Sequence, residues 1–94
     1  MSKIREAARG QSCIRCGRED GTIVHAHYTG VRRIELGGGF GLKVHDLAGA
    51  HLCHECHRVM DTEGRNKEDR WLHSEEFLLL CVKTAIRLYE QGRL

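Results

Sequence analysis

The sequence predicts a small α+β domain: a β-hairpin and a short helix, packed by a C-terminal amphipathic helix. A run rich in β-branched residues at 22–28 is typical of a strand, and it lies between two Cys-x2-Cys pairs. Apolar residues three and four apart over 77–89 are typical of an amphipathic helix. Because 94 residues have room for one core only, we expect a single domain over 1–94.

The composition indicates a core that needs extra support. Only 5% of the residues are aromatic, and domains of this size are commonly held by disulfides or by a structural metal. No apolar stretch of signal-peptide length begins the chain, and the longest apolar run, 77–82, is too short to cross a bilayer. We therefore expect a cytoplasmic protein without membrane contact. In that reducing compartment, five cysteines are better metal ligands than disulfide partners.

The first elements are short. Residues 3–9 predict one or two helical turns that end at Gly10. The strand over 22–28 is followed by a glycine-rich loop at 37–41 and a second short strand near 42–47. These segments predict a hairpin with a long, flexible tip.

Two helices follow the hairpin. The first is expected to begin at about Cys56 and to stop at Gly64. The second is expected over about 74–91, with Ser74 as its N-cap and Gly92 after its end.

The second helix carries an apolar stripe that must cover the hairpin. Trp71 and Leu72 are expected to join this packing, and Cys81 lies on the stripe, so we interpret it as a core thiol rather than a ligand. The stripe consists of Phe77, Leu78, Cys81, Val82, Ala85, Leu88 and Tyr89.

The two Cys-x2-Cys pairs predict a structural zinc site. This spacing lets two thiolates reach one tetrahedral ion, so Cys13, Cys16, Cys53 and Cys56 complete a closed set of four ligands. Gly17 fits the turn after the first pair. A redox pair of the thioredoxin kind is the alternative, but the chain lacks the alternating βαβ pattern of that fold.

Four further polar residues have spacings that suggest a second metal site. His25 and His27 share one face of a strand, whereas His57 and Asp61 share one face of a helix. If the zinc ties these elements together, the four residues could converge on a catalytic ion with open positions. Surface histidines and a solvated helical pair are the alternative.

Basic residues are concentrated in the first third of the chain. The net charge is only +2, but residues 1–33 hold seven basic and three acidic side chains. Arginines there and on the short helix are candidates for phosphate contacts, although they could equally serve solubility. The candidates are Arg15, Arg18, Arg32, Arg33 and Arg58.

These motifs together resemble a known nuclease family. The order C-x2-C-G, a strand ending in Ala26-His27, then C-x2-C-H with Asp61 after His57 resembles the HNH, or ββα-metal, nuclease motif. More narrowly, the segments AARGQSCIRC, AHYTG and DLAGAHLCHECHRVMD are similar to the small lambdoid prophage proteins typified by YbcO. The resemblance covers residues 7–61, implies a treble-clef-like fold with a motif core at 13–61, and places the protein in a bacterial host cell.

The resemblance also implies roles for single residues. His27 would be the general base, and His57 and Asp61 would be ligands of the catalytic metal. The motif's middle Asn is absent, and Asp46 is its nearest match. Ala26 stands where many HNH enzymes have a ligand, a place for which His25 could compensate.

We therefore predict a metal-dependent DNA endonuclease of low sequence specificity, with a structural zinc and a catalytic Mg²⁺, Mn²⁺ or Zn²⁺ ion. The sequence is also compatible with a homodimer. One alternative is a non-catalytic zinc-finger module that binds nucleic acid or a protein. Another is a structural adaptor whose terminal helix docks a partner.

Overall fold

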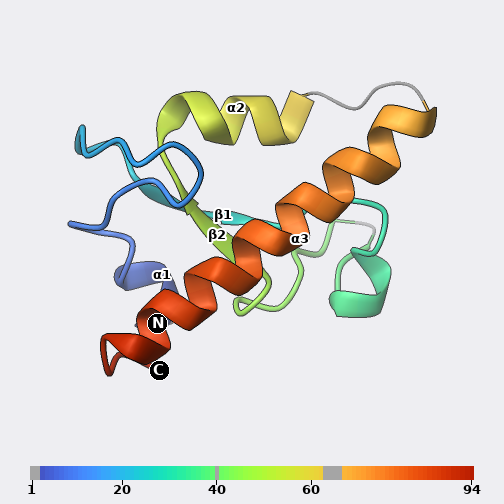
Figure 1. The fold of residues 1–94 in the computed structure, drawn as a ribbon. Coiled ribbons are helices and arrows are strands. Elements are labelled where there is room, and N and C mark those ends of the chain that lie inside the picture. The colour runs from blue at the N-terminus through green and yellow to red at the C-terminus, as the bar shows by residue number, and fades with distance from the viewer. Residues whose placement is uncertain (1–2, 40, 63–66) are drawn as a thin grey trace.

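The computed structural model describes residues 3–39, 41–62 and 67–94. They form a small α+β fold in which a two-stranded antiparallel hairpin is surrounded by helices (Figure 1). In chain order the elements are α1 (Lys3–Glu6), β1 (Val24–His27), the 3-10 turn η1 (Ile34–Leu36), β2 (Gly49–Leu52), α2 (His54–Thr62) and α3 (Lys67–Glu90). The predicted α+β class is confirmed.

The second strand lies further along the chain than predicted. Strand β1 pairs with β2 so that Ala26 faces Ala50, whereas the predicted strand at 42–47 is part of the connection between η1 and β2. All four residues of β2 are buried. The strand therefore lacks the alternation of apolar and polar residues by which a half-exposed strand is recognised in a sequence.

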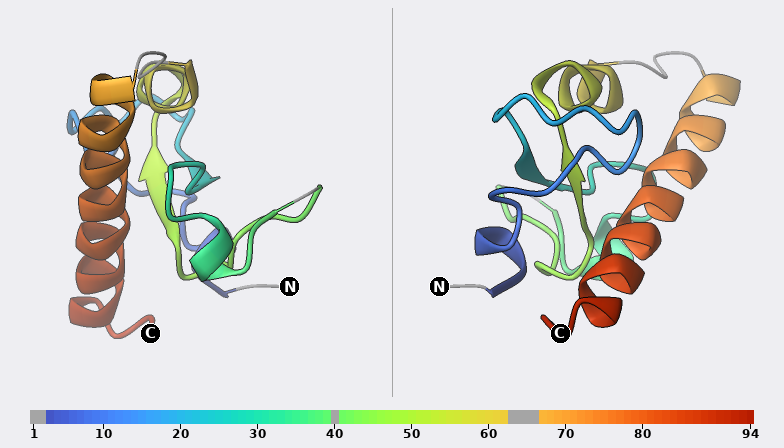
Figure 2. Two further views of the ribbon diagram at one scale, coloured as in Figure 1. Left: turned by 90° about the vertical axis from the view of Figure 1, so that its right-hand side faces the viewer. Right: turned by 60° about the vertical axis from the view of Figure 1, so that its left-hand side comes forward.

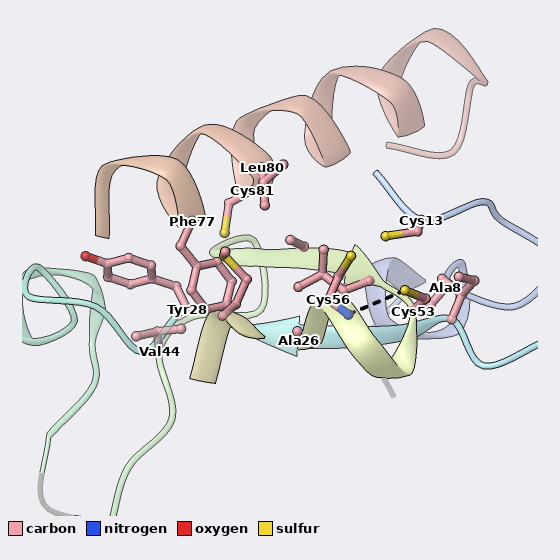
Figure 3. Packing of buried hydrophobic residues seen from close by; sticks show 14 residues of the cluster. Ala8, Cys13, Ala26, Tyr28, Val44, Cys53, Cys56, Phe77, Leu80 and Cys81 are labelled. Atoms are coloured by element: carbon pink, nitrogen blue, oxygen red, sulfur yellow. Dashed lines mark hydrogen bonds between the residues drawn. The ribbon is translucent and has the colours of Figure 1, made fainter. Parts of the chain in front are cut away.

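The pairing register gives the hairpin two different faces. Side chains alternate along a strand, so His25, His27 and His51 share one face, and Ala26 and Ala50 share the other. The alanine face belongs to the main core, which includes buried residues of α2 and α3 (Figure 3). Examples of these core residues are Leu52, Cys56, Met60, Phe77 and Leu80.

The histidine face is covered by α1. The fully buried His51 donates a hydrogen bond from Nε2 to the carbonyl of Ile4 over 2.9 Å, and burial lowers the pKa of His51 to about 4. Ile4 and Ala7 form a second small core with Leu88 of α3. Figure 2 shows α1 at one end of the hairpin, near the C-terminal turns of α3.

The outer edge of β2 is bonded at His51 by α3 and by the segment before β1. The amide of His51 donates to Thr84 Oγ1 over 3.2 Å, and its carbonyl accepts from the amide of Ile14 over 2.9 Å. An unpaired strand edge invites pairing with another chain, and these two bonds satisfy it.

Helix α3 begins at Lys67, so the predicted N-cap Ser74 is wrong. Ser74 is instead a buried residue inside the helix, and its hydroxyl is hydrogen bonded to the hydroxyl of Tyr28. Gly30 lies against this pair so closely that a Cβ there would collide with both oxygens. The helix thus anchors the segment that leaves β1. Gly64, the predicted stop of the preceding helix, lies outside the described residues.

Only part of the predicted apolar stripe faces inward. Phe77, Cys81 and Leu88 are buried, and burial raises the pKa of the Cys81 thiol to about 12, as expected for a core thiol. Trp71 and Leu72 are 54% and 68% exposed, so their predicted packing is wrong. The helix turns every 3.6 residues, and the hairpin reaches only one of its faces. Within the described ranges, no helix combines the length and apolar character needed to span a membrane.

Candidate functional site

The four predicted zinc ligands lie together. We call Cys13, Cys16, Cys53 and Cys56 the cysteine cluster; their sulfur atoms lie within 4.8 Å of one another, and all are free thiols. Cys16 Sγ and Cys53 Sγ are 3.7 Å apart. Tetrahedral zinc with bonds of 2.3 Å separates its sulfurs by about 3.8 Å. The cluster can therefore hold a metal such as zinc.

Local backbone geometry positions these thiols. Gly17 has φ 81°, and its amide donates to the carbonyl of Cys13 over 2.8 Å, which closes the turn that brings the first pair together. Cys53 connects β2 to α2, and Cys56 lies in the first turns of that helix. The cluster thus joins the segment before β1 to the junction after β2.

The surroundings shift the pKa values of two of these thiols in opposite directions. Burial raises the pKa of Cys13, but hydrogen bonds from the backbone of Cys53 and Cys16 outweigh it and lower the pKa to about 6. Burial raises the pKa of Cys56 to about 12. Arg15 extends Nη1 to Cys56 Sγ over 3.5 Å and Nε to Glu76 of α3 over 3.1 Å. This arginine therefore couples the cluster to the long helix.

A second group of potential ligands lies at the other end of the hairpin. His25, His27 and Asp46 each offer a ligand atom within 4.8 Å of the others, and we call them the histidine cluster. The two histidines project from one face of β1, as predicted, with their ring centroids 5.0 Å apart. Asp46 comes from the connection that leads into β2.

His25 is a neutral imidazole with one nitrogen unused. Its Nε2 donates to the carbonyl of Asp46 over 2.8 Å, whereas its Nδ1 is buried and has no hydrogen-bond partner among the described residues. Burial, and then the neighbouring His27, lower the pKa of His25. A neutral imidazole with a free lone pair is the form that binds a metal ion, so this residue fits a ligand role.

His27 is oriented by a carboxylate. Its Nε2 lies 2.7 Å from Asp46 Oδ1, and the second carboxylate oxygen lies 3.4 Å from Nε of Arg5. The His27 side chain is 15% exposed, so it is held in place yet reachable from solvent. The contribution of Arg5 had no signal in the sequence, because it depends on α1 folding back over the histidine face.

His57 and Asp61 form a separate pair on α2. Their side chains are 3.0 Å apart, and Thr29 Oγ1 donates to the other oxygen of Asp61 over 3.4 Å. Among the described residues they join neither the cysteine cluster nor the histidine cluster. The expected convergence of these two residues with His25 and His27 is therefore not found, because α2 packs on the alanine face of the hairpin.

The five candidate arginines are exposed, and each has a polar partner within the chain. Arg15 has the contacts given above, and Arg18 pairs with Asp20 at 3.7 Å. Arg32 pairs with Glu35 at 3.0 Å and lies over the ring of Trp71. Arg33 donates to the carbonyl of Gly30 over 3.4 Å, and Arg58 pairs with Glu55. Exposed ion pairs are weak, so these cations stay available to an anionic ligand.

Comparison with known proteins gives one match. The family model described as "Putative nuclease YbcO" matches residues 2–92. Searches of the curated proteins and of the solved structures found no match. The family match confirms the narrower resemblance seen in the sequence, that to the YbcO-type nucleases.

Proposed function

The chain belongs to the YbcO family, and from this premise we propose that it is a metal-dependent DNA endonuclease of the HNH type. The observation that carries the proposal is the histidine cluster, in which an oriented imidazole lies beside further potential metal ligands. We propose that residues 1–94 form one such domain, with its motif core at about 13–61.

The order of elements supports a ββα-metal, treble-clef-like fold. Strands β1 and β2 form an antiparallel hairpin, and α2 follows β2 after a single residue, Cys53. Zinc in the cysteine cluster would fix the start of the hairpin to the start of this helix. Such a clamp stabilises a small core and holds the neighbouring side chains still.

His27 is the proposed general base. Because its Nε2 donates to Asp46, Nδ1 is the nitrogen left to accept a proton from the attacking water. Asp46 fixes this tautomer and would stabilise the imidazolium that forms, as carboxylates do beside catalytic histidines. Arg5 holds the carboxylate from its other side.

The divalent ion has two candidate positions. His57 and Asp61 on α2 are the ligands that the family resemblance favours, and they are already paired. The histidine cluster is the second position, supported by the unpartnered Nδ1 of His25. A bound Mg²⁺, Mn²⁺ or Zn²⁺ ion neutralises charge on the phosphate and on the leaving oxygen.

Binding of the DNA backbone is assigned to the exposed arginines. The partners of Arg18, Arg32, Arg33 and Arg58 are exposed carboxylates or a carbonyl, which phosphate oxygens can replace at little cost. Arg15 differs, because it also contacts Cys56 Sγ of the cysteine cluster. Contacts of this kind carry no sequence information, and we therefore expect low sequence specificity.

The test is a plasmid-nicking assay with Mg²⁺, Mn²⁺ or Zn²⁺ and a chelator control. His27→Ala should lower the cleavage rate by about 10²–10⁴-fold without changing zinc content or DNA binding, since a general base typically contributes this much. His54→Ala, at an exposed histidine of α2, is the matched control and should cut normally. If the wild type binds DNA but leaves it intact with every metal, a zinc-finger binding module replaces the proposal.

The position of the ion is tested by metal titration. If it binds at α2, His57→Ala and Asp61→Ala should raise the metal concentration needed for half-maximal cutting, and His25→Ala should not. The opposite pattern would assign the ion to the histidine cluster and make His27 a ligand rather than the base.

A further inference from the structure

The outward side of α3 carries a second apolar stripe. Leu72, Leu79, Val82, Ile86 and Tyr89 are 52–73% exposed, although they lie on a helix whose other face already fills the core. Single exposed apolar residues are ordinary on a protein surface. Five of them on one helix face form a patch of the kind that marks an interaction site.

The spacing of this outer stripe indicates a helix as its partner. Positions 72, 75, 79, 82, 86 and 89 are separated alternately by three and four residues, and only Glu75 among them is polar. This is the repeat with which two helices pack along a shared seam. The inward residues Phe77, Cys81 and Leu88 fall at other positions of the same repeat, so the two faces do not compete.

A groove continues the stripe toward the hairpin connection. It has a volume of about 510 Å³ and lies between α3 and the segment 36–48. Leu36, Leu47 and Ala48 line one wall, and Leu78, Val82 and Ile86 line the other. The apolar surface is therefore wider than a single row of side chains, as a helix partner requires.

The charges along α3 identify the partner. Residues 69–78 of α3 hold three acidic side chains and one basic side chain, whereas residues 79–90 hold two basic side chains and one acidic side chain. One end of the helix therefore complements the other end of an identical helix running the opposite way. A parallel copy would place like charges side by side.

We propose that α3 is the interface of a homodimer, in which the outer stripes of two copies pack antiparallel. The two-fold axis lies between Leu79 and Val82, so Leu79 of each copy packs on Val82 of the other. In this register Glu75 of one copy lies opposite Ile86 of the other. Lys83 is one helical turn from Ile86, so it lies near the Glu75 side chain of the other copy. The histidine face is covered by α1, and none of its residues belongs to the outer stripe, so the proposed interface does not use the candidate site.

Sedimentation equilibrium on the full chain tests the proposal and does not depend on nuclease activity. The wild type should have twice the mass of the chain. The double variant Leu79→Glu, Ile86→Glu should raise the dissociation constant by about 100-fold or more, with unchanged helix content and zinc content. Leu42→Glu is the matched control, because Leu42 is 70% exposed and lies outside the outer stripe. A monomeric wild type, or a double variant that dimerises normally, would overturn the proposal.

Charge reversal tests the orientation. Lys83→Glu alone and Glu75→Lys alone should each weaken the dimer by placing like charges together. The double exchange should restore association. Loss of affinity without restoration, or no effect of either single change, would contradict the antiparallel arrangement.

Discussion

The cysteine cluster and the histidine cluster lie at opposite ends of one short hairpin. Cys53 follows Leu52, which pairs with the first residue of β1, whereas His27 pairs with Gly49 at the other end. Three of the four cysteines are buried, but all members of the histidine cluster are partly exposed. A closed set of ligands suits a structural ion, and a partly open one suits chemistry on a bound substrate. The same two strands thus position both the candidate structural zinc site and the proposed catalytic site.

Loss of the cysteine cluster should have the largest effect. Cys53→Ser is expected to abolish stoichiometric zinc binding and to unfold the chain, because the binding free energy of a structural zinc is about 10–16 kcal/mol. Elemental analysis and circular dichroism measure both effects.

Cys81→Ala is the control for this experiment. It removes a buried thiol that lies outside the cysteine cluster, so the variant should keep its zinc and its fold. Normal folding of Cys53→Ser without zinc would show that the cysteine cluster is not needed for the stability of the fold.

Substitution at the other end should affect activity and leave the fold intact. Asp46→Ala removes the acceptor for His27 and is expected to reduce cleavage by about 10–100-fold, the usual cost of losing a residue that orients a catalytic or ligating histidine. Asp46→Asn keeps an oxygen that can accept the same hydrogen bond and should lose less. Equal rates for both variants and the wild type would remove Asp46 from the mechanism.

Packing beneath the histidine cluster should show the smallest effect. A Cβ at position 49 would collide with the ring of His25, so Gly49→Ala is expected to lower the free energy of unfolding by about 1–3 kcal/mol. Urea denaturation measures this change. In a His25→Ala background the ring is gone, and the same glycine substitution should cost much less. An equal cost in both backgrounds would show that the ring does not depend on this glycine.

The two clusters also differ in how far they could be predicted. The cysteine cluster follows from two local spacings, and all four predicted residues lie together. The histidine cluster depends on the strand register and on the path of the chain between β1 and β2. The sequence correctly placed His25 and His27 on one face, but it had no signal that α1 covers this face.

The errors in the fold have the same origin. Strand β2 is buried on both faces, so its residues show no alternation of apolar and polar side chains, and the sequence predicts a strand at 42–47 instead. The sequence predicts that Trp71 and Leu72 join the core packing, yet both side chains are exposed on the part of α3 that the hairpin does not cover.

The sequence by itself determined the α+β class, the grouping of the four cysteines and the inward-facing thiol of Cys81, since each depends on spacing along the chain or on composition. The family was already visible as a resemblance of whole segments. Only the tertiary structure decided that Asp46 contacts both His27 and Arg5, that His57 and Asp61 do not join the histidine cluster, and that α3 has a second apolar face. Those outcomes depend on which face of the hairpin each helix covers. The packing of the whole core determines which helix covers which face, and a local pattern of residues does not predict it.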